Sequence, residues 1–182
     1  MNQQPQYPQA QQMTAKKSSM PVWIIVIIVV VVSLVVIMGI LGVLAIYGTR
    51  KYISAAKQVE ARSSLSQIGS LAKAAYARDG KVCPSASAKI PAAVPSAAKY
   101  QSNASEWDAD QAANAGFACL GFSMSMPQYY QYEYKATATG FVATARGDID
   151  GDGVVSELSL EGQVQNGTLV VAPTLKEVNV GE

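Results

Sequence analysis

Three aspartates at alternate positions give this sequence its most definite site chemistry. They are Asp148, Asp150 and Asp152, and Gly153 follows them directly. Carboxylate oxygens at this spacing can converge on a hard cation, and the glycine permits the sharp turn that such convergence requires. The segment therefore has two interpretations: a turn that binds calcium, or a solvated turn rich in Asp and Gly, which hairpins favour without a metal.

Two neighbouring residues could add ligands to such a turn. Val154 would supply its backbone carbonyl oxygen, and Glu157 is an optional carboxylate. An EF-hand loop would place a bidentate glutamate where this chain has Ser159. Strand patterns flank the segment, so we expect any calcium site to lie in a hairpin turn and not in a helix-loop-helix hand.

The two cysteines, Cys83 and Cys119, are the other reactive pair. In a small exported domain, two cysteines are typical of one disulfide. Such a bond would close a loop of about 35 residues and stabilise the fold by roughly 2–4 kcal/mol. The alternative is two unpaired buried thiols in a reducing compartment. Their spacing fits no zinc pattern, and the chain has no histidine.

Composition argues against several other functions. Without histidine the chain lacks the commonest general base, and no serine stands in a nucleophile-elbow pattern. We therefore expect neither an enzyme nor a small-molecule substrate. No basic cluster with interleaved aromatic residues indicates nucleic-acid binding.

An uncharged apolar stretch runs from Val22 to Tyr47. It is long enough to span a bilayer, and in lipid even its many β-branched residues must form a helix to satisfy their backbone hydrogen bonds. We predict a transmembrane helix at residues 21–47. Gly39 and Gly42 are small enough for contacts between membrane helices, although their spacing is one residue short of the usual motif and also fits incidental glycines.

The helical pattern continues beyond the membrane span without a turn signal. Residues 48–78 form a predicted stem, and Asp79-Gly80 should end it with a left-handed cap. One face of this stem is apolar at helical spacing: Ile53, Ala56, Leu65, Ile68, Leu71, Ala72, Ala75 and Tyr76. We expect a sheet to pack on that face, because a helix this long needs support beyond its own propensity.

Residues 79–182 are predicted to form a head that contains this sheet. An irregular link at 81–116 precedes the strand candidates: Phe117–Met124, Tyr130–Lys135, Phe141–Arg146, Val154–Val164 and Thr168–Ala172. Short turns between them favour an antiparallel sheet, so the fold class is α+β, with a long N-terminal helix packed on a small antiparallel sheet. The row Tyr130, Tyr132 and Tyr134 indicates a half-buried sheet face or, alternatively, a platform for a ligand.

Charge and tail composition bear on topology. Residues 1–20 are rich in Gln and Pro and are expected to be a disordered cytoplasmic tail. The stem is basic and the head acidic, which suits lipid headgroups and solvent or, alternatively, stem-to-head contacts between neighbouring subunits. Flanking charges alone would place the C-terminus inside. The cysteine pair and the acidic turn favour the opposite orientation, with the head periplasmic or at the cell surface.

This order of anchor, spine helix and antiparallel meander resembles the type IV pilin and pseudopilin fold. The resemblance is carried by Gly42–Gly48, Tyr52-Ile53 and Val59–Ile68, and by a head with Cys83-Pro84, Cys119 and the Gly147–Gly153 turn. It implies a single-pass structural component of a type IV pilus (fimbrium), secretion system or related bacterial envelope apparatus, held in the inner membrane. Such a protein would associate with itself or with other pilin-like subunits, and several pilin-like heads carry calcium loops.

The sequence departs from that family near its N-terminus. Pilin precursors usually have a basic leader that ends in Gly before Phe or Met, and a glutamate early in the apolar helix. No Gly-Phe junction follows Lys16-Lys17, and Val22–Tyr47 contains no glutamate. We therefore expect the chain to stay uncleaved. The alternative function is a membrane-tethered extracytoplasmic binding or adhesion module, not assembled into filaments, that uses Trp107 and the tyrosine region.

Overall fold

The computed structural model describes residues 21–180, so the predicted tail at 1–20 lies outside the described residues. The chain divides into two compact units, Met1–Ile46 and Tyr47–Glu182. Helix α1, Val22–Asp79, contributes to both of them.

The first unit contains the apolar part of α1. Within residues 21–180, Val22–Ala45 is the one helical stretch that is long and apolar enough to cross a membrane. Most of its large side chains are exposed, and apart from the nearby helix backbone no atom lies within 4 Å of the position that a Cβ would take at Gly39 or Gly42. An exposed apolar surface of this length requires lipid or a partner. An N-terminal helix of this kind suits a membrane anchor or a signal segment.

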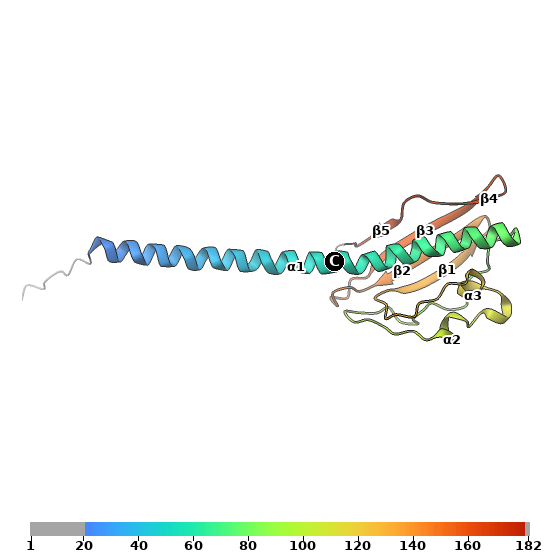
Figure 1. Ribbon diagram of the computed structural model, residues 1–182, viewed down its shortest axis with the longest axis horizontal. Coiled ribbons are helices and arrows are strands. Elements are labelled where there is room, and N and C mark those ends of the chain that lie inside the picture. Colours follow the sequence, from blue (N-terminus) through green and yellow to red (C-terminus); the bar gives the residue numbers. More distant parts are fainter. Residues whose placement is uncertain (1–20, 181–182) are drawn as a thin grey trace, which may run out of the picture. The chain divides into compact units, whose positions relative to one another are not determined.

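The second unit contains an antiparallel sheet (Figure 1). Its strands are β1 (Gln131–Thr137), β2 (Gly140–Gly147), β3 (Ser156–Gln165), β4 (Thr168–Val171) and β5 (Lys176–Val178). The first four form a meander, as the sequence predicted. The fifth strand was not predicted. It pairs with residues 157–159 of β3, whereas β4 pairs with residues 162–165.

The outer edge of β1 is covered by the link that precedes it. The amide of Ala86 donates to the Tyr134 carbonyl at 3.0 Å. Ile90 forms a bridge with Tyr132 through two backbone hydrogen bonds, of 3.0 and 2.7 Å. The other edge of the sheet is shared between the short strands β4 and β5.

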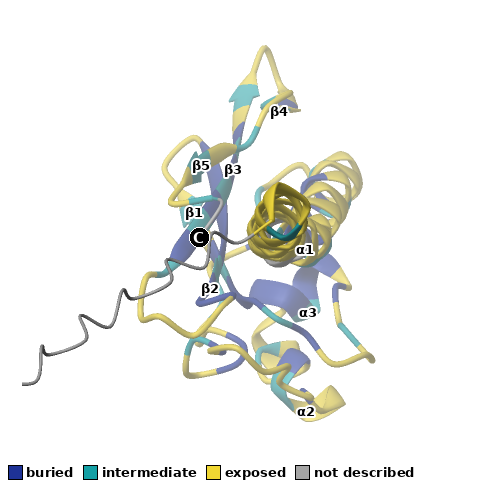
Figure 2. Ribbon diagram, turned by 90° about the vertical axis from the view of Figure 1, so that its left-hand side faces the viewer, coloured by how far each residue is buried: buried dark blue, intermediate teal, exposed yellow. Residues whose placement is uncertain are grey.

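Helix α1 packs on one face of this sheet (Figure 2). Leu65 and Ile68 are fully buried, and Ala72 and Ala75 nearly so, as the helical spacing predicted. The other four residues of the predicted face are less buried. Leu71 and Tyr76 are partly buried against the core, but Ile53 and Ala56 are exposed. The prediction of an apolar face was wrong at these two positions because the buried part of the helix starts at Gln58.

Glycine lets α1 approach the sheet closely. A Cβ at Gly69 would lie 2.7 Å from Cδ2 of Leu160 on β3 and 3.1 Å from Cγ1 of Val171 on β4. The helix ends as predicted at Asp79, where Gly80 has φ +67° and donates its amide to the Tyr76 carbonyl at 2.8 Å. The left-handed conformation at this position favours glycine.

The tyrosine row belongs to the core. Tyr130, Tyr132 and Tyr134 have no exposed surface, and Trp107 is 2% exposed. The Trp107 ring packs edge-on against Phe117 and Phe122, with centroids 5.1 and 5.3 Å apart. The prediction of a half-buried sheet face is therefore confirmed. The alternative prediction, a ligand platform on these rings, was wrong because a ligand cannot reach them.

The strand predicted at Phe117–Met124 is also wrong. Residues Gly116–Leu120 form the short helix α3, which follows α2 (Ala104–Trp107) and a 3-10 turn at Gln111–Ala113. Gly116 and Gly121 have φ of +54° and +70° and bound this segment at both ends. A short apolar run does not distinguish a strand from a buried helical turn, so the sequence alone left the choice open.

The predicted disulfide joins α3 to the segment that follows α1. Cys83 and Cys119 are bonded across a sequence separation of 36 residues, and both are buried. The bond closes the loop that carries α2 and the irregular link, a region with little regular secondary structure of its own.

Removal of this bond should lower the stability of the head. We expect a Cys83→Ser/Cys119→Ser variant to lose roughly 2–4 kcal/mol of unfolding free energy, because the unfolded chain regains its loop entropy. Denaturant titration of the full-length protein in detergent would measure this loss. The wild-type protein under reductant is the control and should match the variant. Equal stability of the oxidised and reduced proteins would contradict the prediction.

Glu60 joins the stem to the sheet. Its carboxylate accepts the Tyr129 amide at 2.8 Å and lies 3.4 Å from the Tyr132 hydroxyl. Burial raises the pKa of Glu60 above its ordinary value, although these hydrogen bonds and the nearby Lys99 act in the opposite direction. Desolvation of the charged form therefore outweighs the contacts that stabilise it.

Because the pKa of Glu60 is raised, the unfolding free energy should depend on pH in a definite direction. The folded state binds this proton more tightly than the unfolded chain, so the ionised carboxylate destabilises the fold above its raised pKa. Glu60→Gln keeps a carbonyl acceptor for the Tyr129 amide and should increase the unfolding free energy at pH 7. The increase should shrink as the pH falls and vanish below about 4.5, the ordinary value.

Chemical denaturation across this pH range would measure the effect of Glu60→Gln. Glu161→Gln is a suitable control, because alternation along β3 places Glu161 on the opposite face of the sheet from buried Leu160. A Glu60→Gln variant that is less stable than wild type at pH 7 would show that the hydrogen bonds outweigh desolvation.

Candidate functional site

The three aspartates converge in the turn between β2 and β3. One carboxylate oxygen from each of Asp148, Asp150 and Asp152 lies within 4.8 Å of the other two. Calcium binds oxygen at about 2.3–2.6 Å, so ligands on opposite sides of one ion are about 5 Å apart. This group, in which Asp148 is buried and Asp150 and Asp152 are exposed, could therefore hold a metal ion.

Asp148 is fixed most firmly. Its carboxylate accepts the Ser96 hydroxyl at 2.7 Å and the amides of Gly151 and Gly153 at 2.8 and 3.3 Å. The Ser96 hydroxyl, followed by these amides, holds the pKa of Asp148 below its usual range despite partial desolvation. The backbone of Asp148 also pairs with Pro95 and Ala97, which ties the turn to the link segment. Asp148 is thus an ionised carboxylate whose position is fixed before any cation binds.

The other two aspartates order the rest of the turn. Asp150 accepts the Asp152 amide at 3.3 Å, and Asp152 accepts the Val154 amide at 2.7 Å. Gly151 and Gly153 have φ of +85° and +91°, which side chains rarely allow. Both carboxylates remain exposed, so each keeps lone pairs for a cation.

Val154 and Glu157, the two further candidate ligands, have different surroundings. Val154 follows the turn and is exposed at its end. Glu157 lies on β3, where its carboxylate accepts Arg146 Nε at 2.7 Å, and it does not belong to the converging group. The structure thus brings the three aspartates together and pairs Glu157 with Arg146.

Sequence reasoning missed the contact that holds this turn against the stem. Lys57 Nζ donates to the Ile149 carbonyl at 2.8 Å and lies 4.8 Å from the centroid of the Tyr129 ring. Lys99 Nζ lies at the same distance from that ring. The one signal in the sequence was Ile149 itself, an apolar residue within an acidic turn, and it is buried.

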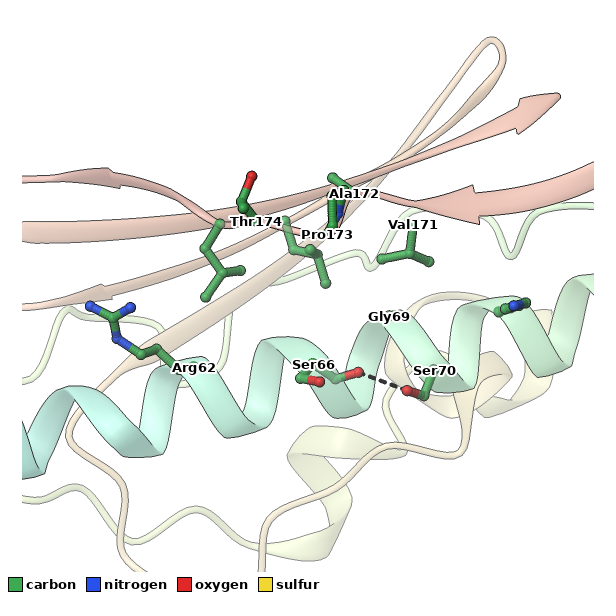
Figure 3. Close-up of a pocket in the computed structure, with 11 residues that line it drawn as sticks. Arg62, Ser66, Gly69, Ser70, Val171, Ala172, Pro173 and Thr174 are labelled. Carbon is green, nitrogen blue, oxygen red and sulfur yellow. Dashed lines mark hydrogen bonds between the residues drawn. The ribbon is translucent and has the colours of Figure 1, made fainter.

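A groove of about 380 Å³ lies elsewhere in the second unit, between α1 and the connection from β4 to β5 (Figure 3). Ser66 and Ser70 line the helix side, and Leu160 and Val171 contribute apolar surface. Residues 173–175 line this groove and form a bulge opposite the single residue Leu160 of β3. The bulge lies between the Ala172–Glu161 hydrogen bond and the pairing of Lys176 with Ser159. The volume of the groove falls within the range of small-molecule sites.

Two stem cations line the same groove. Arg62 forms an ion pair with Glu177 of β5 within the same chain, so one stem-to-head contact is intramolecular. Lys73 is exposed near the other end of the stem.

Comparison with protein-family models, curated proteins and solved structures finds no match for this chain.

Calcium binding to the turn can be tested directly. Three carboxylates should give a dissociation constant on the order of 10⁻⁴–10⁻³ M, typical of weak extracellular sites. Isothermal titration of the full-length protein in detergent should show calcium heat that Asp150→Asn abolishes. Asp108→Asn, an exposed aspartate of the head outside the turn, should leave the heat unchanged. The calcium interpretation fails if the wild-type protein gives no heat at millimolar calcium.

Proposed function

We propose that the protein is a single-pass, pilin-like structural component of a bacterial envelope apparatus, such as a type IV pilus or a secretion system. The observation that carries this proposal is α1. One helix has an exposed apolar part of membrane-spanning length, Val22–Ala45, and a second part packed on an antiparallel meander. Its role is positional and not catalytic: the first part anchors the subunit, and the second presents the head.

The disulfide supports an extracytoplasmic head. Such bonds persist in oxidising compartments and are rare in the cytosol. The head therefore lies in the periplasm or at the cell surface, and the tail at residues 1–20 in the cytoplasm.

The solvent side of the stem supports self-association. Val59 is 60% exposed, and small or uncharged residues such as Ser63, Ser66 and Ala74 are exposed along the same helix. A surface of this composition permits close approach of a second helix, from another copy or from another pilin-like subunit.

A second candidate function is a membrane-tethered binding module that does not assemble. The groove beside Ser66 and Ser70 favours it, because its volume suits a small ligand or a short segment of a cell-surface polymer. Trp107 takes no part in this version, since its ring is buried.

Cysteine crosslinking in cells would separate the two functions. Both native cysteines are bonded to each other, so an introduced cysteine reports alone. We expect Val59→Cys on the stem to form crosslinked multimers under mild oxidation, because copies pack through their stems. Lys135→Cys, on an exposed position of β1, is the matched control and should stay monomeric.

Shearing the same cells would place the protein. We expect it in the sheared surface filaments as well as in membranes, detected with an antibody to the head, and its intact mass would report any processing. Uncrosslinked protein found in membranes alone would favour the binding module. Protein in neither fraction would contradict the anchor.

A further inference from the structure

The tip of the hairpin between β3 and β4 carries an asparagine directly before a glycine. Asn166 and Gly167 form the turn, and Gln165 pairs with Thr168 beside it. Asn166 and Gly167 have φ of +50° and +75°, as the primed turns of tight hairpins require. In Figure 2 this end of β4 projects from the rest of the second unit.

An asparagine side chain can be attacked by the backbone nitrogen of the next residue. That nitrogen bonds to the side-chain carbon Cγ and gives up its proton, and the carboxamide nitrogen Nδ2 takes a proton and leaves as ammonia. The product is a cyclic succinimide. Water then breaks the ring at either of its carbonyl carbons and returns a proton to the backbone nitrogen. Opening at Cγ gives aspartate, and opening at the main-chain carbon gives isoaspartate.

Both reacting groups are free at this turn. Within the described residues, the Asn166 carboxamide and the Gly167 amide form no hydrogen bond. Glycine has no side chain to hinder the attacking nitrogen, and it permits a wide range of backbone rotation. Residues 165–168 are all exposed, so the rotation that closes the ring disturbs only the closing pair of the hairpin.

The other three asparagines in residues 21–180 are each restrained. The Asn103 carboxamide caps α2 by accepting an amide hydrogen bond of 3.2 Å. The carboxamide of Asn179 donates to a backbone carbonyl at 3.3 Å. Asn114 is followed by Ala115, whose amide donates to the Asp110 carbonyl at 3.2 Å. In each case the reaction must first break a hydrogen bond of one of its two groups or of their immediate surroundings.

Aspartate before glycine reacts in the same way, with water as the leaving group. The chain has three such steps: Asp79-Gly80, Asp150-Gly151 and Asp152-Gly153. The glycine amide of each step is already bonded. That of Gly80 donates to the Tyr76 carbonyl at 2.8 Å, and those of the other two donate to the Asp148 carboxylate at 2.8 and 3.3 Å. Among the described residues, only the step at Asn166 therefore has an unbonded glycine amide.

We propose that Asn166 deamidates spontaneously in the folded head and turns an uncharged hairpin tip into an anionic one. Residues 162–175 contain no charged side chain, so the new carboxylate is the one charge of this stretch. Isoaspartate also lengthens the main chain of the turn, and turn length sets the register of a hairpin. The strand affected is β4, which borders the groove through Val171. The reaction needs water and no enzyme or partner, so it does not depend on the proposed function.

Ageing the full-length protein in detergent would test this reaction. At mildly alkaline pH, peptide mapping should show the mass increase of an amide-to-acid exchange in the peptide that contains residues 166–167. The rate should rise with pH, because the attacking nitrogen must lose its proton. Asn166→Gln should abolish the change, since its longer side chain closes a ring slowly, whereas Asn179→Gln, the matched control, should leave it unaltered.

The denatured chain separates the effect of structure from that of sequence. In the folded protein, an isoaspartate-specific label should mark residue 166 alone. In denaturant it should also mark the three Asp-Gly steps, because their glycine amides lose their hydrogen bonds. Deamidation of Asn166 in denaturant but not in the folded protein would show that the hairpin protects this step, and would overturn the proposal. Labelling of the Asp-Gly steps at equal rates in both states would overturn the selection of residue 166 by the structure.

Discussion

The contact between α1 and the tyrosine-bearing face of the sheet is the interaction on which the head depends. A sheet with one apolar face must bury that face against another element. Here the stem supplies the second layer. Leu65 and Ile68 from the helix and Tyr132 from β1 are all fully buried. The same helix also carries the candidate membrane span. The candidate span and the second layer of the head are therefore parts of one element, and a break in the stem would separate them.

This packing carries an internal cost. The Tyr134 ring stacks on Phe141 with centroids 5.4 Å apart, and its hydroxyl has no hydrogen-bond partner within the described chain. Burial raises the pKa of Tyr134, as expected where nothing stabilises the phenolate. An unpartnered buried hydroxyl opposes folding. Two polar groups at the contact between α1 and the sheet therefore oppose folding: this hydroxyl and the partly desolvated carboxylate of Glu60.

Sequence periodicity predicted the correct element where a segment has one buried face. The alternation in Tyr130–Lys135 and the helical spacing from Leu65 to Ala75 each predicted an element that the structure contains. Periodicity failed at Phe117–Met124, where the run is short and is interrupted by Gly121, which has a positive φ. It also missed β5, because Lys176–Val178 has too few residues to show a period. The aspartate turn could be predicted as a local motif. Its attachment to Ser96 and Lys57 could not, because those contacts join segments far apart in the chain.

The protected edges of the sheet bear on whether copies of this head would aggregate through their strands. An uncovered strand offers free amides and carbonyls to any neighbouring strand. In this head the link at Ala86 and Ile90 occupies the edge of β1, and the opposite edge is divided into two short strands by the bulge at residues 173–175. Neither side offers a long, straight template. The sheet edges of this head therefore do not favour strand pairing between copies.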